Sequence, residues 1–307
     1  LYSSAASDVY KETVVSLLTQ TAFSASWFVN NSTGDDLFDG TSATLGGGSI
    51  GPKKTINAAL LFASYSDTIY ISDGLYEETL VIDKGLVIRG NNWGIDPLTT
   101  ARLAETIIVS PIQAISLPIS GNSLIEIKSC CVEIDGISLS GDNPNLSVSK
   151  TKYGEEFEIS YGIAGKGNFD NLHFTNLFIS NFSNVGINFT SGIYSTKSNL
   201  INKCSIKVGE DKSIGILFNE NFYSNLSNLS IDSTGTGLIL DSFYVKSGVI
   251  STYSFLDIRA ELSGINLFNF SGNTDSIYFE YNNIKQLDPS YNFIGFWISN
   301  ISSLGFA

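Results

Sequence analysis

A glycine followed by an apolar residue recurs along most of the chain, at intervals of about 22 to 31 residues. The pairs are Gly136-Ile137, Gly162-Ile163, Gly186-Ile187, Gly215-Ile216, Gly237-Leu238, Gly264-Ile265 and Gly295-Phe296. A second apolar position lies midway in five successive units, at Leu177, Cys204, Leu229, Leu256 and Ile284. Repeats of this length are typical of solenoids, in which each unit packs only against its neighbours.

Two short alternating segments per unit, without helical segments between them, predict an all-β fold, the parallel β-helix. Side chains alternate between the two faces of a strand. One interior column should therefore contain Ile187, Ile216, Leu238, Ile265 and Phe296, and the five midway residues should form a second. The asparagine-rich turns agree with this fold, because asparagine tolerates left-handed backbone geometry.

The amino-terminal segment differs from the repeats. Tyr10, Val14, Leu17 and Leu18 recur at helical spacing, which predicts an amphipathic helix over residues 7–22. This helix either docks the chain onto a partner or packs on the body of the solenoid. We therefore expect two parts, a docking segment at 1–26 and a β-helix domain at 27–307. A second capping helix is expected near residues 54–64.

Residues 27–90 also carry the motifs of a known family. The stretch from Trp27 to Asp36, the run Thr55-Ile56-Asn57-Ala58-Ala59-Leu60 and the run Leu86-Val87-Ile88-Arg89-Gly90 resemble the start of pectin-lyase-like proteins. The resemblance implies a single-stranded right-handed parallel β-helix whose first coil is capped by a helix. It implies no particular activity, because this superfamily includes lyases, glycoside hydrolases, epimerases, phage tailspikes and adhesins.

The catalytic motifs of the superfamily's branches are not found. The polygalacturonase branch combines an Asp pair with His-Gly and Arg-Ile-Lys motifs, whereas here the pair Asp35-Asp36 lies in the amino-terminal loop. The acidic cluster and arginine of the calcium-dependent pectate lyases cannot be matched residue by residue, and the uronan epimerase signature is absent.

The charge balance excludes some functions. Charged residues make up 15% of the chain and its net charge is -13, whereas about 25% are charged in an ordinary globular domain. An acidic chain without a basic stripe is a poor nucleic-acid binder. The single histidine, His173, excludes histidine-rich zinc sites and is expected at the surface.

Three cysteines at these spacings predict no disulfide framework. At least one is expected as a small core hydrophobe. Adjacent Cys130 and Cys131 would point to opposite faces if both lay in a strand.

The candidate ligand-binding residues come from stacking the coils. If Cys204, Leu229 and Leu256 are equivalent, then Lys207, Asp232 and Arg259 form one outward column. Asp257 lies outward on the same strand, two residues before Arg259, with Lys285 next in the column of Asp257. One interpretation is a polysaccharide site, where a basic side chain takes a sugar C5 proton or holds an anionic sugar. The other is an exposed ion-pair ladder that contributes little stability.

Two further surface features stand out. Leu217, Ile239 and Trp297 are large apolar residues at outward positions, which predicts an interface, with a trimer as one arrangement. Exposed aromatic residues are expected to stack on sugars; they are Trp93, Tyr194, Tyr223 and Tyr244. No cofactor is expected, although the acidic loop residues Glu155, Glu156 and Glu158 would suit calcium if it is a ligand.

The main functional prediction is a surface-exposed β-helical rod, a cell-surface adhesin or a virion fibre of the tailspike type, that contacts glycans or partner subunits without catalysis. The alternative is a polysaccharide-processing enzyme, most plausibly a lyase acting on an anionic polysaccharide, or else a glycoside hydrolase. A third interpretation is a structural component of a larger assembly. We expect an extracellular, cell-surface or virion location, an oligomer or larger assembly, no nucleic-acid partner and no membrane span.

Overall fold

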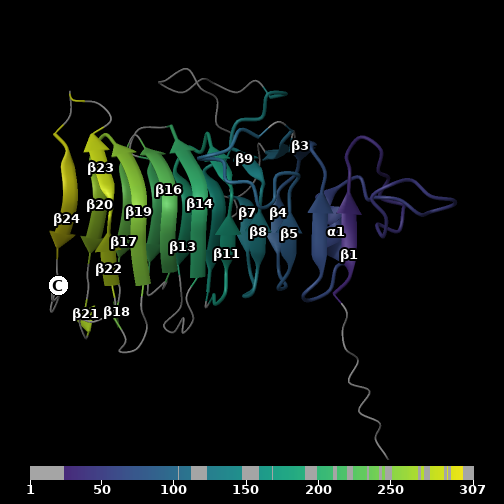
Figure 1. Cartoon of the computed structure of the whole chain (residues 1–307), viewed down its shortest axis with the longest axis horizontal. Coiled ribbons are helices and arrows are strands. Elements are labelled where there is room, and N and C mark those ends of the chain that lie inside the picture. Colours follow the sequence, from purple (N-terminus) through teal and green to yellow (C-terminus); the bar gives the residue numbers. More distant parts are fainter. Residues whose placement is uncertain are drawn as a thin grey trace, which may run out of the picture.

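The computed structural model describes residues 24–102, 104–111, 123–146, 159–167, 169–190, 199–209, 213–219, 224–233, 235–241, 244–245, 251–268, 271–272, 277–286, 289 and 292–299. Over these residues the chain winds coil upon coil along one long axis (Figure 1). The neighbouring strands of the two large sheets pair in parallel. This confirms the predicted right-handed parallel β-helix. The predicted helix at 7–22, and with it the division at residue 26, lies outside the described residues.

Each coil contributes strands to three faces, two of which belong to one bent sheet. Strip A1 of that sheet contains β1 (Ser26–Val29), β2 (Thr68–Ile71), β5 (Val87–Arg89), β8 (Glu133–Asp135), β11 (His173–Thr175) and β22 (Ile277–Glu280). Strip A2 contains β3 (Gly74–Glu77), β6 (Thr106–Val109), β9 (Ser138–Ser140), β12 (Phe178–Ser180) and β23 (Asn283–Gln286). Three long strands run through both strips: β14 (Asn199–Val208), β16 (Ser224–Ser233) and β19 (Ser251–Ala260).

The third face is sheet B. It contains β4 (Leu80–Ile82), β7 (Ser123–Ile127), β10 (Tyr161–Lys166), β13 (Val185–Thr190), β15 (Ile214–Asn219), β17 (Thr236–Asp241), β20 (Ser263–Phe268) and β24 (Ile294–Ser299). A short extra pair joins β18 (Tyr244–Val245) and β21 (Ser271–Gly272). The three faces enclose one continuous apolar core.

The interior columns follow the predicted register, with one exception. In sheet B, Ile187, Ile216, Leu238, Ile265 and Phe296 pair in sequence from coil to coil. In strip A2, Cys204, Leu229 and Leu256 also pair as predicted. Ile284, however, pairs with Ile258 and not with Leu256. The predicted alignment was wrong because the polar residue Asn282 precedes this last strand, where the earlier units have an apolar residue.

The bend between strips A1 and A2 has the same construction in successive coils. Its first residue has a positive φ in each case: Gly136, Asn176, Lys203, Asn228, Phe255 and Tyr281, at φ 51° to 72°. Two residues separate the strip A1 segment from the strip A2 segment each time. Asparagine occupies the left-handed position in two of these bends, as expected, while a lysine and two aromatic residues also adopt it.

The repeated glycines of sheet B face strip A2 across the core. A Cβ at Gly237 would overlap Ile258 Cγ2 and lie 2.8 Å from the carbonyl oxygen of Gly264. The same conflict recurs at Gly264, with the isoleucine of the next coil. The glycine repeat therefore reflects the close approach of two sheets, and a side chain at these positions would force them apart.

The first coil is closed by α1 (Ile56–Phe62), within the predicted 54–64. Thr55 caps its amino terminus, and the Phe62 ring stacks on Trp27 at 6.0 Å. Burial raises the pKa of Glu78, whose carboxylate accepts hydrogen bonds from the backbone of Ile56 and Asn57. The core of the rod is thus covered at this end by a helix rather than by another coil.

The cysteines form no disulfide. Cys204 is fully buried, as expected of a core hydrophobe. Cys130 and Cys131 do not lie in a strand, so the alternation expected of strand residues does not apply to them: they lie between β7 and β8, and their sulfur atoms are 2.9 Å apart. The positive φ of Cys131 replaces the alternation of an extended strand, so the two side chains converge.

Candidate functional site

A groove of about 510 Å³ runs over the outer face of strip A2. We call it the A2 groove. Its floor is made by outward side chains of β3, β6, β9, β12 and β14, which are apolar at Leu75, Ile107, Val109 and Phe178 and hydroxylated at Ser138, Ser140, Ser180 and Ser205. Each coil offers two outward positions on this strip, so the floor repeats about every 4.8 Å along the rod.

A loop after β9 forms one wall of the A2 groove, through Asp142 and Pro144. Asn143 is fully buried and its amide donates to the carbonyl of Ser110 at 2.5 Å. Asn145 donates to the Glu77 carboxylate at 2.8 Å. These bonds tie the wall to β3 and to the segment after β6, so the groove is held open by polar contacts rather than by packing alone.

An ion pair supports the floor from the side. Arg102 and Glu105 are 2.6 Å apart, and the Arg102 side chain is 1% exposed. Ser138 donates to the same Glu105 oxygen at 2.9 Å, and the guanidinium lies 5.0 Å from the centre of the Phe178 ring. Sequence reasoning missed this cluster. An Arg and a Glu three residues apart in a loop give no signal of a contact with residues more than thirty positions away.

Lys207 lines the far end of the A2 groove, and the charged column begins there. Lys207 pairs with Asp232, Asp232 with Arg259, and Arg259 with Lys285, in four adjacent strands. We keep the name charged column for these four residues. The structure thus brings together three of the predicted site residues in the predicted order.

Arg259 and Asp232 form a two-point contact. The Arg259 Nε lies 2.6 Å from Asp232 Oδ1, and Nη2 donates to Oδ2 at 2.7 Å. Arginine carries its proton throughout the range in which proteins are folded, so Arg259 cannot take a proton from a sugar. The two-point contact instead fixes the position of the Asp232 carboxylate, and the Arg259 guanidinium places positive charge at the surface.

Asp257 lies beside this pair, on the neighbouring outward row. Asn283 of the next coil donates to Asp257 at 2.8 Å. Asp232 pairs with Arg259, two residues beyond Asp257, so the two aspartates are diagonal neighbours, about 7–8 Å apart. The site therefore holds two carboxylates and three cations within four coils, and Lys285 lies beside Arg259 rather than beside Asp257 as predicted.

The predicted interface residues lie on sheet B, away from the A2 groove. Leu217 and Ile239 are adjacent in register and half-buried, while Trp297 is 44% exposed and is separated from them by Asn266. Trp297 lies 6.4 Å from the Phe268 ring. The three do not form one unbroken apolar column, because Asn266 interrupts it, and an oligomer remains a prediction.

Other candidates are placed as follows. His173 is exposed on strip A1, as expected. The acidic residues Glu155, Glu156 and Glu158 lie outside the described residues, as do Tyr194, Tyr223 and the side chain of Tyr244. In the part of the chain that the structure describes, no three His, Cys, Asp or Glu residues come together as metal ligands, and no helix has the length and apolar character of a membrane span.

Comparison with known proteins bears on the fold. No protein-family model and no curated protein matches the chain. Among solved structures, a GH136 lacto-N-biosidase from Eubacterium ramulus matches with a TM-score of 0.54 at 13% identity, over 88% of this chain and 57% of that one. The pectin methylesterase PemA from Erwinia chrysanthemi matches with a TM-score of 0.44 at 14% identity, over 88% and 95%. The pectin methylesterase from Aspergillus niger matches at 0.41 and 16%, over 94% and 91%.

Together with the parallel pairing of the strands, the match to the lacto-N-biosidase supports the right-handed parallel β-helix fold. The comparison also corrects the main functional prediction. The prediction of an adhesin or fibre without catalysis is contradicted, because the neighbour that matches with a TM-score of 0.54 is named as an enzyme, a lacto-N-biosidase. The alternative, polysaccharide processing, agrees better with this finding.

Proposed function

We propose that this chain is a polysaccharide-processing enzyme that acts on an acidic polysaccharide lying in the A2 groove. The observation that carries the proposal is the continuity of that groove with the charged column: its apolar and serine-lined floor ends at Lys207, next to Asp232 and Arg259. Apolar side chains and hydroxyls suit the two faces of a sugar ring, and the cations suit its carboxylate.

The reaction that these residues support best is β-elimination. In this step the amine nitrogen of Lys207 takes the proton from C5 of a uronate. The C–H electron pair forms the C4–C5 double bond, and the C4–O bond breaks, so that the leaving oxygen departs with its electron pair and is protonated. Arg259, anchored by Asp232 at 2.6 Å, holds the uronate carboxylate, where negative charge builds up in the transition state.

Hydrolysis is a second candidate, favoured by the diagonal placement of Asp232 and Asp257. Glycoside hydrolases use a pair of carboxyl groups, one as acid and one as base, and Asp232 and Asp257 supply two carboxyl groups on adjacent strands. In that reaction Asp232 would activate a water molecule, and Asp257 would protonate the leaving oxygen.

The test is incubation of the protein with pectate, alginate and hyaluronate, following unsaturated products by ultraviolet absorbance and new reducing ends by a colorimetric assay. Elimination yields both signals, whereas hydrolysis yields reducing ends alone. Lys207→Ala should lower the elimination rate about 100-fold or more, while Asp257→Asn should abolish only hydrolysis.

Lys128→Ala is the matched control, since Lys128 lies on sheet B and contacts Glu126 at 3.1 Å. It should leave either activity unchanged. Absence of both signals across the three polymers would refute the proposal. We also propose that the protein is extracellular, which is where it would meet a polymeric substrate.

A further inference from the structure

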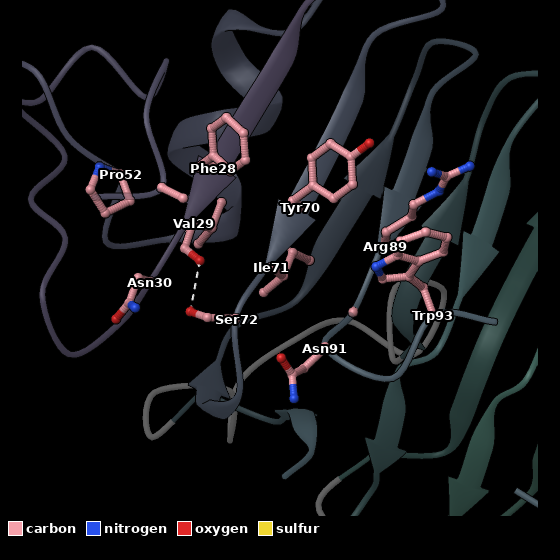
Figure 2. A pocket seen from close by; sticks show the side chains of 12 residues that line it. Phe28, Val29, Asn30, Pro52, Tyr70, Ile71, Ser72, Arg89, Asn91 and Trp93 are labelled. Carbon is pink, nitrogen blue, oxygen red and sulfur yellow. Dashed lines mark hydrogen bonds between the residues drawn. The ribbon is translucent and has the colours of Figure 1, made fainter. Parts of the chain in front are cut away.

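A second cavity, of about 240 Å³, lies on the outer face of strip A1 near the amino-terminal end. Figure 2 shows its aromatic side chains arranged across adjacent strands. Phe28, Tyr70 and Arg89 occupy equivalent positions on β1, β2 and β5, and Trp93 reaches the same face from the turn after β5. We call this the aromatic pocket.

The side chains of the aromatic pocket stack on one another in the order Phe28, Tyr70, Arg89 and Trp93. Phe28 and Tyr70 stack with centroids 5.5 Å apart and an angle of 16°. The Arg89 guanidinium lies 4.7 Å from the centre of the Trp93 ring and 5.9 Å from that of Tyr70. Trp93 is nevertheless 50% exposed, so it keeps ring surface for a ligand. An exposed aromatic surface of this kind, held in place, marks a binding site.

Arg89 has unused capacity for hydrogen bonds. Its Nε is buried without a partner in the described chain, and its nearest acidic contact, Glu133, is 3.8 Å from Nη2. That distance is too long for a hydrogen bond. A buried donor that lacks a partner costs free energy, and a ligand carboxylate that accepted from Arg89 would remove this cost.

The backbone around Trp93 is fixed by its neighbours. Both carboxylate oxygens of Asp135 accept from the Gly94 amide at 3.1 Å, and the Trp93 amide donates to the carbonyl of Gly90 at 3.2 Å. A Cβ at Gly136 would overlap the backbone of Asn92 and Trp93, so this turn is pressed against the adjacent coil. The tryptophan is therefore pre-positioned, which lowers the entropic cost of binding.

We propose that the aromatic pocket binds one acidic sugar residue of a polysaccharide, with the sugar ring against the exposed surface of Trp93 and its carboxylate on Arg89. Amides and a hydroxyl at the rim, from Asn30, Asn91 and Ser72, suit the hydroxyls of the sugar.

The pocket adjoins the A2 groove along the chain. β2 leads directly into β3, and Ser72 of the pocket is three residues before Leu75 of the groove. The aromatic pocket is thus a second contact for the polymer that the groove holds, away from the charged column. The choice of an acidic sugar as the ligand rests on the proposed function. The existence of the aromatic pocket does not depend on that proposal.

The test is isothermal titration of the full chain carrying both Lys207→Ala and Asp257→Asn, so that the ligand survives either reaction, with uronate-containing hexamers prepared from pectate, alginate and hyaluronate. A neutral xylose hexamer is the comparison ligand. We expect at least one acidic hexamer to bind, and Trp93→Ala and Arg89→Gln each to weaken it roughly tenfold, the size of one aromatic or charged contact. Tyr281→Ala, a 79% exposed tyrosine at the other end of the rod, is the matched control and should change nothing.

Each result separates the two proposals. Binding that depends on Trp93, without turnover of polymer by the unsubstituted chain, would support the pocket and refute the enzyme. If turnover and binding are both unaffected by Trp93→Ala and Arg89→Gln, the proposed sugar binding at the aromatic pocket is refuted and the proposed enzymatic activity stands. Absence of binding by all three acidic hexamers, or equal binding of the xylose hexamer, would also overturn the inference. Circular dichroism of each variant confirms that the β-helix is retained.

Discussion

The sharpest prediction from the packing concerns Gly237 in the glycine repeat of sheet B. Replacing it with alanine adds one methyl group between sheet B and strip A2. That methyl would overlap Ile258 Cγ2 and lie 2.8 Å from the carbonyl oxygen of Gly264. Neither neighbour can yield easily, because one is backbone and the other belongs to a β-branched side chain with a restricted χ1.

The expected cost is large for a single methyl group. Overpacking a dense core costs about 1–3 kcal/mol, and the two simultaneous conflicts at Gly237 argue for the upper end, about 3 kcal/mol. With a urea dependence of about 3 kcal/mol per molar, the unfolding midpoint should fall by about 1 M. An unstrained Gly→Ala change would instead stabilise by about 0.4–1 kcal/mol, because it restricts the unfolded chain.

Urea unfolding followed by tryptophan fluorescence measures the effect. Gly47→Ala is the matched control, since a Cβ there meets nothing within 4 Å, and its midpoint should not fall. Adding Ile258→Ala to Gly237→Ala should cost less than the sum of the two single changes, by about 1 kcal/mol or more. A Gly237→Ala midpoint equal to that of the control, or strict additivity in the pair, would refute the steric explanation of the glycine repeat.

Three further predictions follow from local environments. Burial raises the pKa of Asp67, but hydrogen bonds from Ser64, Trp27 and Ala25 outweigh it and leave the pKa below its ordinary value. Its carboxylate therefore stabilises the fold above the unfolded pKa, and this contribution is lost as the pH falls through the folded pKa. In urea titrations Asp67→Asn should cost about 1–3 kcal/mol at pH 7, and this cost should shrink as the pH is lowered; a cost independent of pH would contradict the assignment. Burial raises the pKa of Cys204 to about 12, so a thiol-specific reagent should label at most two of the three cysteines until the protein is unfolded, and labelling of all three in the folded state would contradict the structure. If the exposed face of Trp297 is an interface, light scattering should give a multiple of 33.2 kDa and Trp297→Lys should reduce it to the monomer; a monomer before substitution would exclude this oligomer.

The coil architecture was predictable from the sequence because the same steric demand recurs in every turn of the solenoid. Gly215, Gly237 and Gly264 each face an isoleucine of the opposite strip, so the demand appears as a period in the sequence. The column Lys207, Asp232 and Arg259 follows from that period by counting, since parallel pairing in register places equivalent residues side by side.

The A2 groove was not predictable in this way. Its wall depends on Asn143 and Asn145, whose partners lie in earlier coils and leave no pattern in the sequence. The supporting contact between Arg102 and the carbonyl of Asn176 spans 74 residues. Strand β3 was also missed, because four residues beginning with a glycine are too few to reveal alternation. Contacts that occur only once in the molecule leave no period in the sequence, so they can be identified only from the structure.

The bend between strips A1 and A2 has a consequence for how this protein can be altered. Since two residues form the bend in each coil from β8–β9 to β22–β23, the outward rows on both sides keep a constant offset along the rod. A substitution at an outward position of either row therefore changes the chemical group presented without moving the backbone that carries it. The triad Lys207, Asp232 and Arg259 could therefore be rebuilt one coil earlier, at 180, 207 and 232, about 4.8 Å along the axis, with the same mutual geometry and a shorter approach from the aromatic pocket.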